Sequence, residues 1–418
     1  MSRAPKFEPF SFAKFLAASG IYASSDGVLQ RWNGKCWLKI EDEDALKIAL
    51  RWIVDNDESN ASNVSANSAL RTAMLWLPTL KDSANIPIIP LQNGYLHLDG
   101  GATLRAHDKE LGLRHVLGCD YAPTAPKPET FDKLLQTILP DAAVRSRVQE
   151  YVGYTLLPDA RFHLAQIWIG PGANGKGTLA SIVRALHGRY AAASPNQLEK
   201  SYAAQLIGAS LIYCDEAPPK DWCEQTIKSM ISGEPIFIDR KYLPGITARI
   251  TAKWIICANH IPSVQDQSNG FWRRFDIVPF IVEVPAKERD PLLADHIIKH
   301  ELTGVLNWAL EGLQRLLARG RFDAAPPPAM IVATQNARME TNSVHAWVND
   351  AAIERTTTTD TSKSETYTVY SIWCRANGMI PVASPKFWKR LPDTLGPITE
   401  GRTTTSSGRI RTCNVRLS

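Results

Sequence analysis

The stretch "WIGPGANGKGTLASIVRALHG", from Trp168 to Gly188, constrains the fold more than any other part of the sequence. An apolar run ends at Ile169 and is followed by a glycine-rich segment. Four apolar residues then recur at the spacing of one helix face: Leu179, Ile182, Val183 and Leu186. This order predicts a buried strand, a tight loop and a helix that ends at Gly188. Because a helix N-terminus presents free N–H groups and a positive dipole end, we expect the loop to bind an anion.

The loop is close to the phosphate-binding pattern G-x-x-x-x-G-K followed by Ser or Thr, but Gly177 stands at the hydroxyl position. Lys176 is expected to reach the β- and γ-phosphate oxygens of a nucleoside triphosphate as a point charge. Thr178 carries the nearest hydroxyl and would replace the missing Mg²⁺ contact directly or through a water. The residues expected to bind nucleotide are Gly170, Pro171, Gly172, Ala173, Asn174, Gly175, Lys176, Gly177 and Thr178.

Polar residues follow or precede three further apolar runs. Asp215 and Glu216 follow "SLIYC", where Asp215 would hold Mg²⁺ together with Thr178 and Glu216 would polarise the attacking water. Asn259 follows "AKWIICA" and is expected to sense the γ-phosphate or orient that water. Arg273 and Arg274 precede "FDIVPF", and one of them would contact a phosphate bound by a neighbouring subunit.

The apolar runs from about 161 to 325 alternate with helical patterns, which predicts an α/β domain with a parallel sheet covered on both faces. With 418 residues and 44% hydrophobic content, the chain is long enough for several domains. We therefore predict an α+β module over 1–125, a helical collar over 126–160, the α/β core over 161–325 and a helix-rich module with a β wing over 335–418. The three consecutive prolines at 326–328 mark the last boundary.

Cysteine spacing and hydropathy bear on the compartment. The seven cysteines form no C-x-x-C pair, so neither a disulfide framework nor a zinc site is indicated. No stretch reaches the roughly 18 apolar residues that a membrane span needs, so we expect a cytoplasmic protein without a membrane partner. The net charge of +5 is concentrated in the segment 381–418, which is either a solvated basic surface or a nucleic-acid contact.

The ordered set "GPGANGKGT", "LIYCDE", "ISGEPIFIDRKYLPGITARITAKWIICANHIP" and "GFWRRFDIVPF" resembles the superfamily 3 helicases, specifically the primase-helicases of phages, plasmids and large DNA viruses. The resemblance covers residues from about 85 to 418. It implies an AAA+ ATPase core, ATP and Mg²⁺ as cofactors, and a homo-oligomeric, hexameric ring that moves along one DNA strand 3′ to 5′. By position it places Lys176 in the Walker A loop, Asp215 and Glu216 in Walker B, Asn259 in the sensor strand and Arg274, or else Arg273, as the arginine finger.

The same resemblance implies two DNA contacts. "DRKYLPG" matches a DNA-gripping hairpin and places Arg240, Lys241 and Tyr242 beside its tip, where cations would meet phosphates and the aromatic ring a base or sugar. The C-terminal segment resembles a winged-helix module with Tyr367, Tyr370 and Trp373 in its core. Its candidate DNA contacts are Lys386, Lys389 and Arg390.

The N-terminal 125 residues are short for a primase domain. Asp42 and Asp44 form a D-x-D pattern, which we interpret as acidic residues opening a helix, where they complement the helix dipole. The sequence therefore predicts a DNA helicase without primase activity, acting on single-stranded or forked DNA, with a separate primase or other replication proteins as partners. Two alternatives stay open: an origin-binding initiator that binds specific duplex without separating strands, and a P-loop kinase whose ATP turnover ignores DNA.

Overall fold

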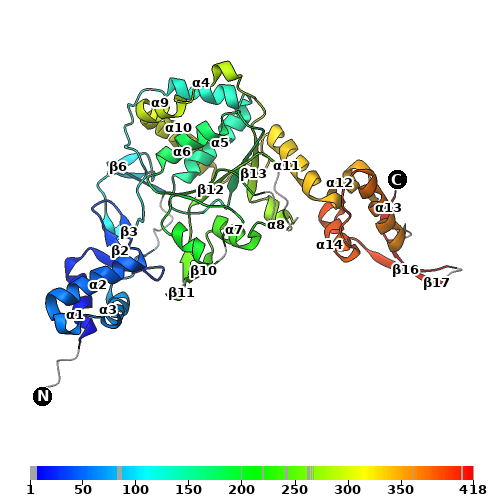
Figure 1. Cartoon of the computed structure of the whole chain (residues 1–418). Helices are drawn as coiled ribbons and strands as arrows, with labels where there is room; N and C mark the ends of the chain where they lie inside the picture. The colour runs from blue at the N-terminus through cyan, green and yellow to red at the C-terminus, as the bar shows by residue number, and fades with distance from the viewer. Residues whose placement is uncertain are drawn as a thin grey trace.

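The computed structural model describes residues 7–81, 87–198, 200–218, 221–240, 243–260, 264, 266, 268–359, 361–405 and 408–417. The chain is arranged as an N-terminal module, a central α/β core and a C-terminal module that lies at the far end of the molecule (Figure 1). No helix in these described ranges is both long enough and apolar enough to cross a membrane.

The N-terminal module packs three helices beside a small antiparallel sheet. The helices are α1 (Pro9–Ser19), α2 (Asp42–Asp57) and α3 (Asn63–Trp76), and the sheet has β1 (Tyr22–Ser25), β2 (Val28–Trp32) and β3 (Trp37–Lys39) in that order. Helix α2 begins with three acidic residues in its first turn, so Asp42 and Asp44 open a helix as the sequence predicted. A short 3₁₀ turn, η1 (Glu58–Asn60), links α2 to α3.

A second antiparallel sheet and two helices connect this module to the core. The sheet has β4 (Ile88–Leu91), β5 (Gly94–His97) and β6 (Thr103–Arg105), followed by η2 (Lys109–Leu111). Helix α4 (Glu129–Ile138) lies in the predicted helical collar and buries one face, made of Phe131, Leu134, Leu135 and Ile138. Helix α5 (Ala142–Thr155) is fixed to the core by a buried ion pair, since Arg147 Nε donates to Asp276 Oδ2 at 2.6 Å and Nη2 to Oδ1 at 3.1 Å.

The core is a five-stranded parallel sheet in the order β13-β7-β12-β9-β8. Its strands are β7 (Ala165–Ile169), β8 (Tyr190–Ala192), β9 (Leu211–Cys214), β12 (Lys253–Ala258) and β13 (Phe275–Pro279). Strand β7 is therefore first in the chain but lies between the two strands that come last. The predicted parallel sheet is present, and β8 is an edge strand that the sequence pattern did not reveal.

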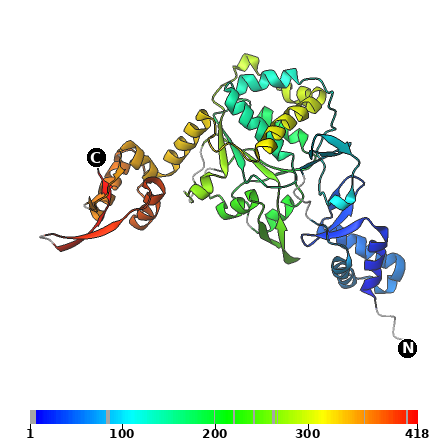
Figure 2. The same cartoon turned by 180° about the vertical axis from the view of Figure 1, so that it is seen from behind.

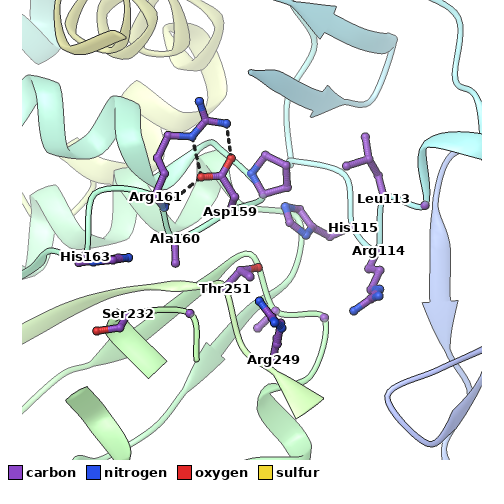
Figure 3. A pocket seen from close by; sticks show the side chains of 15 residues that line it. Leu113, Arg114, His115, Asp159, Ala160, Arg161, His163, Ser232, Arg249 and Thr251 are labelled. Atoms are coloured by element: carbon purple, nitrogen blue, oxygen red, sulfur yellow. Dashed lines mark hydrogen bonds and ion pairs between the residues drawn. The ribbon is translucent and has the colours of Figure 1, made fainter. Parts of the chain in front are cut away.

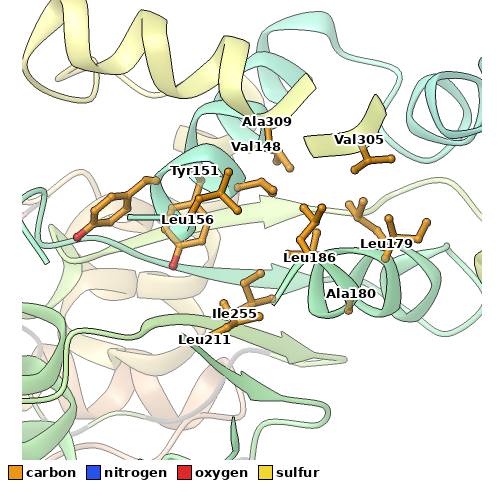
Figure 4. Packing of buried hydrophobic residues seen from close by; sticks show 14 of the residues in the cluster. Val148, Tyr151, Leu156, Leu179, Ala180, Leu186, Leu211, Ile255, Val305 and Ala309 are labelled. Atoms are coloured by element: carbon orange, nitrogen blue, oxygen red, sulfur yellow. The ribbon is translucent and has the colours of Figure 1, made fainter. Parts of the chain in front are cut away.

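Helices cover both faces of this sheet. They include α6 (Lys176–Leu186), α7 (Glu224–Ile231), α8 (Asn269–Trp272), α9 (Leu293–His300) and α10 (Leu302–Arg319), with 3₁₀ turns η3 (Lys200–Leu206) and η4 (Ala286–Glu288). Figure 4 shows the packing on one face, where Leu179 and Leu186 of α6 lie beside Ile255 of β12 and under Val305 of α10. Burial of α6 against the sheet fixes where its N-terminus points.

A hairpin, β10 (Pro235–Arg240) and β11 (Leu243–Arg249), projects from the core. On β10 buried and exposed residues alternate, with Ile236 and Ile238 facing inward and Phe237 outward. The inward residues pack in the same cluster as Val28 of the N-terminal module. A Cβ atom added to Gly27 of that module would approach the Ile246 side chain to 2.5 Å, so the hairpin and the module are in close contact.

The C-terminal module is joined to the core by one helix, α11 (Pro328–Thr341) (Figure 2). It consists of α12 (Ser343–Asp350), α13 (Lys363–Ala376) and α14 (Ser384–Leu395), a pair β14 (Glu354–Arg355) and β18 (Val415–Arg416), and a sheet β15-β17-β16. The strands of that sheet are β15 (Thr361–Ser362), β16 (Glu400–Thr405) and β17 (Gly408–Cys413). Among the predicted core residues, Tyr370 is fully buried, while Tyr367 and Trp373 are half-buried.

Candidate nucleotide-binding site

The loop between β7 and α6 is built on two left-handed glycines. Gly170 has φ +157°, and a Cβ atom there would lie 2.2 Å from the Phe280 carbonyl oxygen. Gly175 has φ +80°, and a Cβ atom there would lie 2.4 Å from Ile138 Cγ2. Only glycine fits these positions without rearrangement. Gly172 has open space around its Cβ position, so the outer side of the loop is accessible.

Lys176 points into the loop that it follows. Its Nζ donates to the carbonyl oxygens of Gly170 at 2.6 Å and Pro171 at 3.1 Å, and to Asn174 Oδ1 at 3.2 Å. Lys176 is largely buried, and this burial lowers the pKa of its ammonium group. Asn174 is also buried and donates to the Phe280 carbonyl at 3.1 Å. The ammonium is thus held at the centre of the loop by acceptors of the loop itself.

Gly177 and Thr178 lie in the first turn of α6. Gly177 is exposed and has no heavy atom within 4 Å of its Cβ position, so a serine would fit there without a clash. Thr178 is half-buried. The missing hydroxyl at position 177 therefore does not reflect a lack of space.

The predicted site residues on three adjacent strands come to the same edge of the sheet. In the pairing of β7 with β12, Ile169 is level with Ala258, so the loop at 170–175 and Asn259 follow neighbouring strand ends. Asp215 follows β9, the next strand along, and Glu216 comes after it. Asp215, Glu216 and Asn259 are all exposed. Because carboxyl ends of parallel strands form the usual ligand crevice of open α/β sheets, this edge is the candidate nucleotide site.

Tyr213 also lies at this edge, although the sequence motifs did not indicate it. Its hydroxyl donates to Asp215 Oδ1 at 2.5 Å, and the Arg184 guanidinium of α6 lies 4.6 Å from the centre of its ring. Burial raises the pKa of Tyr213, so the phenol keeps its proton and serves as a donor. The sequence feature that could have identified Tyr213 is its spacing from Asp215, because residues two apart lie on the same side of a strand.

Arg273 and Arg274 lie at the opposite edge. Phe275 of β13 is level with Ala165 of β7, so both arginines come before the amino ends of these strands. The side chain of Arg274 is half-buried, and it donates from Nε to Ser232 Oγ at 3.1 Å and from Nη1 to the Gly270 carbonyl. Arg273 is exposed. Neither arginine is near the loop of its own chain.

The predicted DNA contacts differ in their surroundings. Arg240 is 11% exposed, and its Nη1 lies 3.1 Å from both carboxylate oxygens of Asp42 in α2. Arg240, predicted as a DNA contact, is therefore paired with an acidic residue of the N-terminal module in this structure. Lys241 and Tyr242 lie outside the described residues. Phe237, exposed by 74% on the outer side of the same hairpin, is an aromatic side chain that the sequence analysis missed.

On the C-terminal module, Lys386 and Lys389 are exposed on α14. Arg390 is 8% exposed, and burial lowers its pKa. Arg390, predicted as a DNA contact, is therefore largely withdrawn from the surface, and Glu224 of α7 in the core is among the charged groups near it.

A separate polar pocket lies at the amino ends of the strands. Figure 3 shows Asp159 and Arg161 facing each other there, with Arg161 Nη2 donating to Asp159 Oδ2 at 2.6 Å. Its other lining residues include His115, Arg249 and Thr251. The pocket is thus on the side of the sheet opposite to Lys176 and is not part of the candidate nucleotide site.

The chain is similar to known proteins in both sequence and fold. Residues 168–274 match a family of unknown function (DUF5906), and residues 12–140 match the family described as D5 N terminal like. An apo structure of the NrS-1 C-terminal region is similar with a TM-score of 0.52 and 12% identity, covering 99% of this chain and 100% of that one. Another A-form apo structure of that region gives a TM-score of 0.53 and 14% identity, with 98% and 100% coverage.

The DUF5906 match runs from the end of the loop's preceding strand, through Asp215 and Asn259, to Arg274. It therefore contains the residues that the structure brings to the candidate site and both arginines at the opposite edge. At this level of identity the likeness to solved structures concerns the fold. The chain is a mixed α/β protein that shares its overall fold with the NrS-1 C-terminal region and resembles the D5 N-terminal-like family over residues 12–140.

Proposed function

We propose that this protein is an ATP-dependent DNA helicase of the superfamily 3 type, which forms a ring and unwinds DNA during replication of a phage, plasmid or other mobile element. The observation that carries the proposal is the single sheet edge at which the Lys176 loop, Asn259 and Asp215 follow three neighbouring strands. The D5 N-terminal-like match and the shared fold support a role in replication of mobile DNA.

The loop residues fit a nucleoside triphosphate. Lys176 lies inside the loop at hydrogen-bond distance from three loop oxygens, and the oxygens of a bound phosphate would replace these acceptors. The N-terminus of α6 and the backbone amides of the loop would bind the phosphates, as the N-termini of helices commonly do. The left-handed glycines let the backbone approach them closely.

The carboxylates supply the remaining chemistry. Asp215, oriented by the Tyr213 hydroxyl, would hold Mg²⁺ through its free oxygen, with Thr178 contributing directly or through water. Mg²⁺ would neutralise the charge that develops on the phosphate oxygens. Glu216 would accept the proton of the attacking water, and Asn259 would orient that water.

The arginine finger is assigned here to Arg273. Strands β7 and β13 have five residues each, which corresponds to roughly 16 Å between their two ends at about 3.3 Å per residue. An arginine at the amino edge would therefore act on nucleotide bound by a neighbouring copy, as in ring-shaped ATPases. Arg273 is preferred to Arg274 because it is exposed, whereas Arg274 uses two of its donors within its own chain.

The first test measures ATP hydrolysis with and without single-stranded DNA, alongside unwinding of a forked duplex. We expect DNA-stimulated hydrolysis and strand separation, both lost in Lys176→Ala while the thermal unfolding midpoint is retained. A rate of ATP hydrolysis that is unchanged by DNA would favour the P-loop kinase. Specific duplex binding without strand separation would favour the initiator. Wild-type turnover in a folded Lys176→Ala variant would refute the site.

The second test mixes two inactive variants, Arg273→Ala and Lys176→Ala. Some interfaces in a mixed ring pair an intact loop with an intact finger, so part of the hydrolysis should return. Normal hydrolysis by Arg273→Ala alone would refute its assignment and leave Arg274, the residue first favoured from the sequence, as the finger.

A further inference from the structure

The hairpin of β16 and β17 carries three arginines on one face. Their strand register places Arg402 directly opposite Arg411 and Thr404 directly opposite Arg409. Residues that face each other across antiparallel strands lie on the same side of the sheet, and so do residues two apart along one strand. Arg402, Arg409 and Arg411 therefore share a face, and all three are exposed.

This arrangement is unfavourable for the hairpin itself. Like charges directly opposite each other destabilise an antiparallel pair. Glu400 lies on the same face, but its carboxylate is already bound by Lys363 Nζ at 2.5 Å, at the base of the hairpin. Within the described ranges, no carboxylate lies at ion-pair distance from the three arginines. The charges therefore lack an internal partner in this part of the chain.

Protection of a sheet edge does not account for the pattern. Strand β15 pairs only with Thr412 and Cys413, so beyond its base the hairpin is a two-stranded ribbon that projects from the helices (Figures 1 and 2). Exposed strands often carry charges that prevent pairing with other chains. Such protection needs charge along the strands, not on one face, and the opposite face carries the pair Thr403 and Ile410 without arginine.

We infer that this arginine face binds the phosphate backbone of double-stranded nucleic acid. Arginine is well suited to phosphate because its planar guanidinium donates several hydrogen bonds in a fixed geometry. A surface for single strands normally adds aromatic rings on which bases stack. The described residues of this face offer arginines and the Thr404 hydroxyl but no aromatic ring, which favours a duplex held by its backbone alone.

The test uses the full-length protein without nucleotide and a fluorescently labelled duplex in a salt series. The double variant Arg402→Gln/Arg411→Gln is compared with Arg51→Gln/Arg375→Gln, which removes the same charge from exposed positions on α2 and α13. Each neutralised phosphate of a B-form duplex contributes about 0.9 to the slope of log K against log salt. We expect the hairpin variant to lower that slope by about 1.8 and to weaken binding about 30-fold near 0.15 M salt.

Equal losses in the two double variants would refute a specific surface, and so would unchanged duplex binding by the hairpin variant. A loss confined to single-stranded DNA would refute the assignment to a duplex. Thermal unfolding serves as the folding control, because removing two opposed like charges should not lower the midpoint of the hairpin variant. The measurement needs no ATP, so its outcome is independent of whether Lys176 supports hydrolysis.

Discussion

Replacing Asp42 by Asn should increase the affinity of the protein for single-stranded DNA, although Asp42 lies in the N-terminal module. Its two carboxylate oxygens each lie 3.1 Å from Arg240 Nη1, so any phosphate bound by Arg240 must compete with this carboxylate. The amide of Asn keeps the shape of the side chain and removes the charge. Arg240 should then bind a phosphate at the hairpin more readily, because this carboxylate no longer competes for it.

The structure limits the size of the effect. The Arg240 side chain is 11% exposed and that of Asp42 37%, so the pair is partly screened and stabilises the contact by at most about 1 kcal/mol. Releasing that energy corresponds to an affinity increase of up to about fivefold. One additional phosphate contact should also steepen the salt dependence of binding to single-stranded DNA by about 0.7. The module should stay docked, because the contact of Gly27 with Ile246 is unchanged.

The assay is fluorescence anisotropy of a labelled oligodeoxythymidine over a range of salt concentrations. Glu43→Gln is the matched control: it removes an equal charge from the same first turn of α2, and Glu43 pairs with Lys47 at 2.7 Å instead of with Arg240. The double variant Asp42→Asn/Arg240→Gln should bind no better than Arg240→Gln alone. If Asp42→Asn and Glu43→Gln give the same change, or if Asp42→Asn weakens binding, the competition does not exist.

Three further predictions concern the core. Gly177→Ser should be tolerated because its Cβ position is open, whereas Thr178→Ala should raise the Mg²⁺ concentration needed for half-maximal hydrolysis; identical Mg²⁺ titrations for Thr178→Ala and wild type would exclude Thr178 as a ligand. Tyr213→Phe, which removes the hydroxyl bound to Asp215, should likewise weaken apparent Mg²⁺ affinity more than it lowers the maximal rate, and an unchanged titration would contradict a positioning role. Burial lowers the pKa of Lys253 to about 7, so above that pH the unfolded chain binds more protons than the folded protein. The free energy of unfolding should therefore rise between about pH 7 and the ordinary lysine pKa near 10, and Lys253→Met should flatten this rise in denaturant unfolding measured at several pH values.

Local patterns were sufficient for much of the fold. The period of the apolar residues identified α6. Continuous apolar runs identified β7, β9, β12 and β13, because burial on both faces of a parallel sheet leaves a strong signal. Strand β8 was missed because it has three residues, and two of them are exposed. A short edge strand has neither the length nor the apolar content that sequence reasoning needs.

Local sequence patterns did not predict contacts between residues that are far apart in the chain. The residues of the Arg240–Asp42 pair are 198 positions apart, so nothing near "DRKYLPG" indicates that an acidic residue faces the arginine. The burial of Arg390 likewise depends on elements that are far apart in the sequence, since Glu224 of α7 is among the charged groups near it. Tyr213 shows the opposite case, since its spacing from Asp215 was readable but tyrosine is not part of the motif that was searched for.

Helix α11 connects the surroundings of Arg273 with the C-terminal module. Arg338 of this helix donates to Asn269 of α8 at 2.6 Å, and its guanidinium lies 5.8 Å from the centre of the Trp272 ring, next to Arg273. The helix has 14 residues and is about 21 Å long, and the C-terminal module is attached to its far end. Arg338 is three residues before the end of α11 at Thr341, so its contact with α8 lies only about 4.5 Å along the helix axis from the point where the module is attached. Small rearrangements around Arg273 would thus reach the C-terminal module through the last turn of α11.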